Sequence, residues 1–258
     1  MSQTVLISES AGVRTLSLNR PDRRNALTPE MQFELIAAFD DAAQSSSTRV
    51  VVLTGLGDAF CAGLDLSALQ AMQHKTALQL SDDAHRISHM FRTLYELPLP
   101  TIAAVNGHAI AGGTGLATLC DFTFAVPAAK FGYTEVKIGF VPALVSAYLT
   151  LQIGEKRARD LLLTGRLFTA AEAQTMGLVN EVVAPESLAG HVEAFAKTLA
   201  ANSPTSLRAT KELLANQNRH WLDAAINHSM KANAASRETD DFREGIAAFL
   251  EKRKPSWS

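Results

Sequence analysis

The chain has few cysteines, little net charge and no leader-like segment. Only two of its 258 residues are cysteine, Cys61 and Cys120, which argues against a disulfide framework and for a reducing, cytoplasmic compartment. The formal net charge is −2, so no basic surface is expected to recruit nucleic acid. Met1 to Ser10 lacks a basic start followed by a long apolar run, and we therefore expect no signal peptide.

Long apolar runs are also scarce. Residues 97–120 carry no Asp, Glu, Lys or Arg, a stretch long enough to raise a membrane span. Pro98, Pro100, Asn106 and several glycines interrupt it, so a buried strand, loop and helix fit better than a lipid-facing helix. Hydrophobic residues make up 47% of the chain and charged residues 19%, which is typical of a globular protein with a substantial core and no membrane partner.

Strand and helix signals alternate in the first half of the chain. Val13 to Leu18 and Thr101 to Val105 predict strands, and Thr28-Pro29 predicts a helix start with an N-cap and a first-turn proline. Residues 68–94 predict one long helix. After Pro142 the signals are mainly helical, with helices expected at 185–201, 204–216, 220–235 and 238–250. The order predicts an α/β protein with a layered core of parallel strands.

A glycine-rich turn follows the strand at Thr101 to Val105. Gly112 and Gly113 could begin a helix whose first N–H groups lack internal partners and whose positive dipole end faces a ligand. Such a place suits a carbonyl oxygen that becomes negative during a reaction. A tight turn inside a packed core explains the glycines equally well. A nucleotide-binding P-loop is excluded, because its lysine position is Gly113.

A second loop of the same kind runs from Gly55 to Leu66 after the strand at Val50 to Leu53. Its small residues Ala62 and Gly63 permit close backbone approach. Two such turns after neighbouring strands could aim two N–H groups at one oxygen, and each donor of such an oxyanion hole is worth on the order of 10²–10³ in rate.

Several motifs now coincide with those of a known family. They are Asn19-Arg20-Pro21, Arg24-Asn25-Ala26-Leu27, Phe60-Cys61-Ala62-Gly63-x-Asp65-Leu66, Asn106-Gly107-x-Ala109-x-x-Gly112-Gly113, Phe131-Gly132-x-x-Glu135 and Gly177-Leu178-Val179-Asn180, with Phe249 and Glu251-Lys252-Arg253 near the end. Together, and over essentially the whole chain, they resemble the crotonase superfamily, the enoyl-CoA hydratases and isomerases.

The resemblance implies a crotonase-like fold, a superhelical core of repeated β-β-α units followed by a helical trimerisation region. We expect residues 1–200 to form the acyl-CoA-binding core and residues 201–258 to pack on the core or on a neighbouring subunit. The implied assembly is a homotrimer or a dimer of trimers, and the implied substrate is a coenzyme A thioester of fatty acid metabolism. Coenzyme A is then part of the substrate, and no cofactor or metal is expected.

The resemblance also assigns roles to particular positions. The backbone N–H groups of Leu64 and Gly112 would hold the thioester oxygen, and Glu135 would move protons. The pantetheine path would be lined by Ala62, Asp65 and Leu66. The adenine and phosphate end would lie by Arg24 and the backbone near Ala26, with contributions from Phe249 and Lys252.

One departure from the family pattern concerns the acid–base residues. Two-glutamate hydratases carry a glutamate three residues after the oxyanion-hole glycine, where this chain has Gly115. Glu135 is then the single acid–base group, and its apolar neighbours Phe131, Val136 and Phe140 predict a raised pKa. One base suffices to move a double bond between C3 and C2, so the pattern favours isomerisation. Hydration is ranked almost equally with isomerisation, since Glu135 could act twice or Thr114 could position a water. Acyl-CoA binding without efficient catalysis is the alternative.

Other groups have simpler interpretations. Val141 to Val145 replaces a glycine-rich run common in the family, and its bulk is expected to reshape the acyl pocket. His85 and His89 have metal-compatible spacing without an evident third ligand. We expect His108 to be structural and Cys61 to be a small buried hydrophobe.

Overall fold

The computed structural model describes residues 3–72 and 74–257, without the side chain of Leu66. Ten strands are present in this part of the chain: β1 Val5–Ser10, β2 Val13–Leu18, β3 Val50–Gly55, β4 Ala59–Cys61, β5 Thr101–Val105, β6 His108–Ile110, β7 Phe122–Ala125, β8 Lys130–Gly132, β9 Leu167–Thr169 and β10 Glu181–Val182. The α-helices are α1 Pro29–Gln44, α2 Leu66–Met72, α3 Ala77–Tyr95, α4 Gly112–Leu119, α5 Ala143–Thr164, α6 Ala170–Met176, α7 Leu188–Ala200, α8 Pro204–Ser236 and α9 Asp240–Leu250. Short 3-10 helices are η1 Pro21–Arg23, η2 Glu135–Ile138 and η3 Pro185–Ser187.

The strands form two sheets, with orders β1-β2-β3-β5-β7-β10 and β4-β6-β8-β9. From β3 to β8, strands that follow one another in the chain belong to different sheets. β3, β5 and β7 are neighbours in the larger sheet, whereas β4, β6 and β8 are neighbours in the smaller one. Each such strand pair is followed by helix, so the β-β-α repeat is confirmed. Most pairings are parallel, as predicted, but β1–β2 and β8–β9 are antiparallel.

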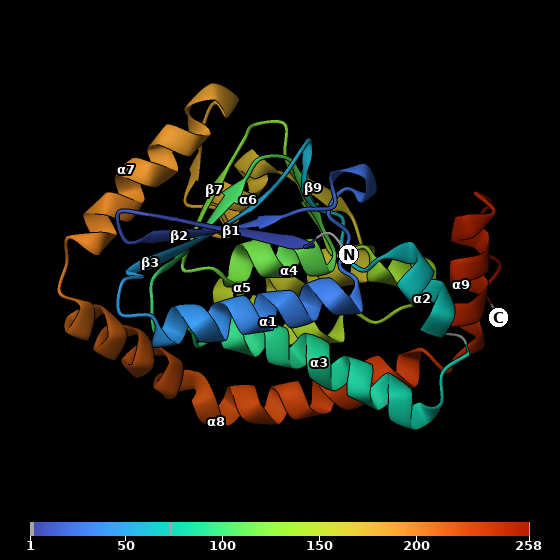
Figure 1. The fold of residues 1–258 in the computed structure, drawn as a ribbon. Helices are drawn as coiled ribbons and strands as arrows, with labels where there is room; N and C mark the ends of the chain where they lie inside the picture. The colour runs from blue at the N-terminus through green and yellow to red at the C-terminus, as the bar shows by residue number, and fades with distance from the viewer. Residues whose placement is uncertain (1–2, 73, 258) are drawn as a thin grey trace.

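The larger sheet lies between layers of helix (Figure 1). Its central strand β3 is almost entirely buried, as its apolar sequence predicts for a strand covered on both faces. α7 contacts β2, β3, β5 and β7, and α1 and α4 contact the sheet as well. The helix start at Thr28 is confirmed, since the Thr28 hydroxyl accepts a hydrogen bond from the Met31 N–H at 3.3 Å.

Three sequence predictions about elements are wrong. The helix expected at 68–94 is divided into α2 and α3, because Thr76 begins a new helix by a capping box with Gln79. The two helices expected at 204–216 and 220–235 are one, α8, since no proline or glycine separates them. The sequence predicts loops where the strands β4 and β6 lie, because three-residue strands give almost no periodic signal.

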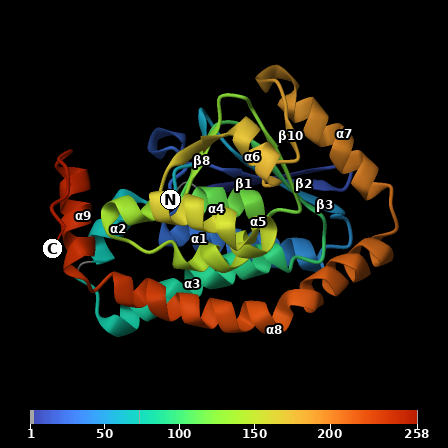
Figure 2. The same cartoon turned by 180° about the vertical axis from the view of Figure 1, so that it is seen from behind.

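The C-terminal region is helical, as predicted. Figures 1 and 2 show α8 running along the side of the molecule that carries α3 and α5, and α9 standing at one end near α2. α9 also contacts η2. No helix in the described part of the chain is long and apolar enough to cross a membrane.

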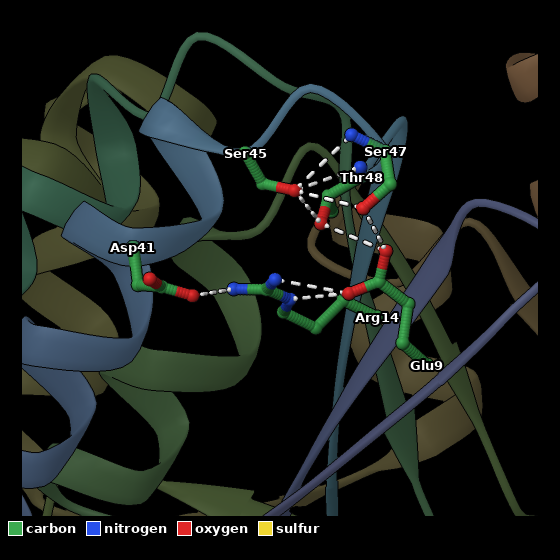
Figure 3. Close-up of polar contacts among 6 residues, drawn as sticks. All are labelled: Glu9, Arg14, Asp41, Ser45, Ser47 and Thr48. Atoms are coloured by element: carbon green, nitrogen blue, oxygen red, sulfur yellow. Dashed lines mark hydrogen bonds and ion pairs between the residues drawn. The ribbon is translucent and has the colours of Figure 1, made fainter.

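A polar cluster fastens the β1–β2 hairpin to the end of α1 (Figure 3). Arg14 on β2 is 7% exposed; its Nη2 donates to Glu9 Oε2 at 2.9 Å, and its Nη1 pairs with Asp41 on α1. Ser47 and Thr48 in the loop before β3 donate to the other Glu9 oxygen. Hydrogen bonds from Ser47 and Arg14 lower the pKa of Glu9 below its usual value. The Arg14–Glu9 pair therefore links a hairpin, a helix and a loop.

Replacing Arg14 with methionine should lower the free energy of unfolding by about 2 kcal/mol, because charge-assisted hydrogen bonds are lost from a largely buried site. Denaturant unfolding of the variant and the wild type measures this change in free energy. The control is Arg243→Met, whose pair with Asp240 is exposed on both sides and should cost less than about 0.5 kcal/mol. Equal effects of the two variants would show that the cluster does not fasten the hairpin.

Candidate active site

Three short strands end at one edge of the smaller sheet, and each is followed by a predicted site residue. β4, β6 and β8 are parallel neighbours, so their carboxyl ends meet. Leu64 follows β4, Gly112 follows β6 and Glu135 follows β8. All three line one cavity of about 800 Å³. The tertiary structure thus brings together the residues to which the sequence assigned one reaction.

The turns that carry Leu64 and Gly112 touch one another. The Leu27 N–H donates to Gly63 O at 2.7 Å and the Asp65 N–H donates to Leu27 O at 3.0 Å, which fixes the first turn. Gly63 has φ +86°, and a Cβ on it would lie 2.9 Å from Ile110 O and 3.6 Å from the Gly112 nitrogen. Only glycine permits this approach.

The N–H groups of Leu64 and Gly112 donate to no acceptor among residues 3–72 and 74–257. Gly112 is the first residue of α4, where a helix leaves its N–H groups unpaired. Two free backbone donors on adjoining turns of one cavity are what an oxyanion hole requires.

Glu135 is a buried carboxyl group that faces this cavity. It opens η2, is 8% exposed, and its Oε2 has no hydrogen-bond partner in the part of the chain described. Burial raises the pKa of Glu135 to about 7, against a smaller opposing effect of its own backbone N–H. The raised pKa expected from its apolar neighbours is confirmed, and the group can exchange a proton near neutrality.

The place of a second glutamate is filled. A Cβ on Gly115 would lie 2.7 Å from Val145 Cγ1 and 3.2 Å from the Phe91 ring. Val145 and Phe91 both line the cavity. Val145 belongs to the run that replaces the family's glycines. The two departures from the family pattern, at Gly115 and at Val141 to Val145, are therefore in contact, and the larger side chain of Val145 fills the space beside Gly115.

Most of the residues assigned to the pantetheine and adenine ends line the cavity. Arg24, Ala26, Ala62 and Asp65 line the cavity, as does Phe249, which is 56% exposed on α9. Lys252 is exposed and does not line it. The side chain of Leu66 lies outside the described part of the structure.

The carboxylate of Asp65 is buried and hydrogen-bonded to other side chains. Its carboxylate accepts a hydrogen bond from Arg20 at 2.8 Å and another from Ser67. Although burial raises the pKa of Asp65, the hydrogen bonds from Ser67 and Arg20 lower it below its usual value. Asp65 is therefore already neutralised, and Glu135 differs from it in having an unpartnered oxygen.

Sequence reasoning missed Asn25 as an organising residue. Its side chain is fully buried, its Nδ2 donates to Leu56 O at 2.9 Å and to Ala59 O at 2.8 Å, and its Oδ1 accepts from the Arg20 N–H. It also has φ +54°, which asparagine tolerates better than most residues. The signal was present in Arg24-Asn25-Ala26-Leu27, where only the flanking residues were assigned.

The other candidate groups do not serve the cavity. Thr114 is fully buried; its hydroxyl accepts from the Gly132 N–H and lies 2.7 Å from Ala109 O, so it is not available to position a water. His108 accepts from the Lys130 N–H and is structural, as expected. Cys61 is buried, and burial raises its pKa to about 12. No cluster of three or more metal-ligating side chains occurs among the residues described.

Comparison with known proteins agrees with this fold. The family model "Enoyl-CoA hydratase/isomerase" matches residues 8–258. The chain is 47% identical over 247 residues to a "Putative enoyl-CoA hydratase" of Thermus thermophilus, covering 96% of this chain and 98% of that protein. It is 34% identical over 253 residues to a "Probable enoyl-CoA hydratase" of Rhizobium meliloti, covering 98% and 96%.

A solved enoyl-CoA hydratase/isomerase from Xanthobacter autotrophicus superposes with a TM-score of 0.90 at 29% identity, covering 98% of each chain. The architecture is thus that of the crotonase fold. The chain belongs to the enoyl-CoA hydratase/isomerase family.

Because Glu135 is buried, replacing it with a neutral residue should stabilise the protein by an amount that depends on pH. Since its pKa rises from 4.5 to about 7 on folding, the folded state keeps its proton while the unfolded state loses it, and stability falls between those two values. Glu135→Gln should therefore raise the free energy of unfolding by up to about 3 kcal/mol at about pH 8, and by almost nothing at about pH 4.

Denaturant unfolding of the variant and the wild type at both pH values tests this expectation. Glu155→Gln, on the exposed face of α5, is the control and should change stability little at either pH. A gain for Glu135→Gln that did not depend on pH would contradict burial of an ionised carboxyl group.

Proposed function

We propose that the protein is an enzyme that acts on an enoyl-CoA thioester through an enolate, with Glu135 as its single acid–base group. The observation that carries the proposal is the meeting of two free backbone N–H groups with one unpartnered carboxyl oxygen in a single cavity. Family membership supplies the substrate class. Coenzyme A enters as part of the substrate, with no further cofactor.

In this mechanism the thioester oxygen accepts hydrogen bonds from the N–H groups of Leu64 and Gly112. The donors stabilise the charge that develops when the C2–H bond breaks, each by on the order of 10²–10³ in rate. Ionised Glu135 takes the C2 proton, and its pKa of about 7 balances base strength against the ability to return the proton. Delivery of that proton to C4 moves the double bond from C3 to C2 with no net change in atoms.

A single free carboxylate favours this isomerisation over hydration. Asp65 is already paired, and Phe91 and Val145 occupy the space beside Gly115. Hydration needs an activated water as well as a proton for C2, and one group would have to do both. Hydration is the second candidate, because relatives at 47% and 34% identity are named enoyl-CoA hydratases.

The same likeness supports a homotrimer or a dimer of trimers, with residues 201–258 contributing to the contacts between subunits. It also supports a role in fatty acid metabolism in the cytoplasm. Leu213, Leu214 and Trp221 are exposed on α8, which is apolar surface that assembly would cover.

A short 3-enoyl-CoA should be converted to a product of unchanged mass with rising conjugated-enoyl absorbance. The rate should rise with pH through about 7 as Glu135 ionises. Glu135→Gln should remove turnover while retaining acyl-CoA binding, and Glu155→Gln should behave as the wild type.

A gain of one water would select hydration instead. Binding without turnover of either a 3-enoyl-CoA or a 2-enoyl-CoA would contradict the enzyme and leave an acyl-CoA-binding protein.

The filled space beside Gly115 predicts how hydration could be introduced. Gly115→Glu alone should destabilise the protein by about 1–3 kcal/mol, because the new side chain meets Val145 and Phe91. Adding Val145→Ala should restore part of the stability and raise the ratio of hydration to isomerisation. Product analysis by mass measures the ratio, with Val145→Ala alone as control. A ratio unaffected by the second carboxylate would show that hydration is not limited by its absence.

A further inference from the structure

Arg237, just after α8, is a buried guanidinium that the proposed reaction does not use. It is 2% exposed, and its Nε and Nη1 have no hydrogen-bond partner in the described structure. Only Nη2 is bound, to Asn233 Oδ1 at 2.5 Å. The guanidinium carbon lies 5.3 Å from the centroid of the Phe140 ring. Phe140 and Asn233 both line the cavity that contains Glu135.

The charge of Arg237 is not neutralised by an ion pair in the part of the chain described. The acidic group that acts on it is Asp83 on α3, and Asp83 already pairs with Lys75 and with Arg86. Arg86 itself opposes the charge of Arg237, and burial lowers the pKa of Arg237 to about 10. A buried charge without a partner destabilises a protein, so its presence beside the cavity needs an explanation.

Asn233 connects this charge to the cavity. It is 3% exposed and lines the cavity from α8. Arg237 binds its Oδ1, which sets the orientation of the amide. Its Nδ2 donates to no protein group among the described residues, and Leu69, Ile87 and Phe140 are apolar residues that line the same cavity. An entirely apolar ligand would leave this donor unpaired, at a cost in affinity.

We propose that Asn233, oriented by Arg237, binds a carboxylate carried by the acyl chain, so that the preferred substrates are CoA thioesters of dicarboxylic acids. The Asn233 Nδ2 donates to the carboxylate, and the unneutralised charge of Arg237 behind it favours an anion over a neutral oxygen. Asn233 is a specificity-determining residue and Arg237 a positioning residue. The inference rests on the proposed function, because it assumes that the cavity holds an acyl-CoA.

Binding of unreactive saturated thioesters tests the inference without catalysis. Calorimetry compares glutaryl-CoA with pentanoyl-CoA and adipyl-CoA with hexanoyl-CoA, pairs that differ in a terminal carboxylate. The wild type should prefer a carboxylated member by about tenfold or more. Asn233→Leu should reduce that preference to near one. Asn227→Leu, on an exposed position of the same helix, is the matched control and should keep it.

Variants of Arg237 separate positioning from a structural role. Arg237→Met should lose most of the preference while the melting temperature stays the same or rises, since an unpaired buried charge is removed. Arg237→Lys should retain part of the preference, because it keeps the charge and a donor for Asn233 Oδ1. A fall in melting temperature with an unchanged preference would make Arg237 structural and overturn its assigned role.

The remaining outcomes distinguish this inference from the proposed function. Tight binding of pentanoyl-CoA or hexanoyl-CoA with no preference for the carboxylated partner would overturn the inference alone. Preference for a terminal hydroxyl over a terminal carboxylate would overturn the assignment of an anion. Failure of every thioester to bind would overturn both proposals.

Discussion

Parallel pairing of the three short strands β4, β6 and β8 is the constraint on which the site depends. Their carboxyl ends meet at one edge, and each strand releases one functional group there. Leu64 and Gly112 contribute main-chain N–H groups, whose positions are set by the fold itself. Glu135 contributes the carboxyl group. Positive φ at Gly63 lets the turns of Leu64 and Gly112 touch, and the buried amide of Asn25 binds the segment that leads into β4, so the donors are in place before any ligand arrives.

The cavity concentrates polar groups that the protein leaves without partners. Glu135 Oε2, two backbone N–H groups and Asn233 Nδ2 belong to residues that line it, and Arg237, whose Nε and Nη1 are unpartnered, binds Asn233 from behind. Most buried polar groups in the molecule have partners, as Arg14, Asn25 and Asp65 show. Unpaired groups cost stability, and a ligand in the cavity would complete the hydrogen bonds of Glu135 Oε2, the two N–H groups and Asn233 Nδ2.

The family and the fold were predictable from sequence, and so were three positions that line the cavity. Quoted motifs located Glu135, Gly112 and Leu64, and the apolar residues near Glu135 indicated its raised pKa. Lys252, predicted at the adenine and phosphate end, does not line the cavity, and Asn25, Phe91 and Asn233 were missed. Phe91 and Asn233 lie on helices whose periodicity indicates only a buried face; which cavity that face borders depends on packing between segments far apart in the chain.

By itself, the sequence determined the local elements and the residue types available: turns that only glycine permits, the threonine at a helix start, and one glutamate where two-glutamate hydratases have two. Tertiary structure alone decided that Val145 and Phe91 fill the space beside Gly115, that Asp65 is neutralised and that Arg237 is not. The physical reason is the distance along the chain over which each interaction acts. Turn and cap preferences act over a few residues, whereas packing, ion pairing and desolvation depend on groups brought together from the whole chain.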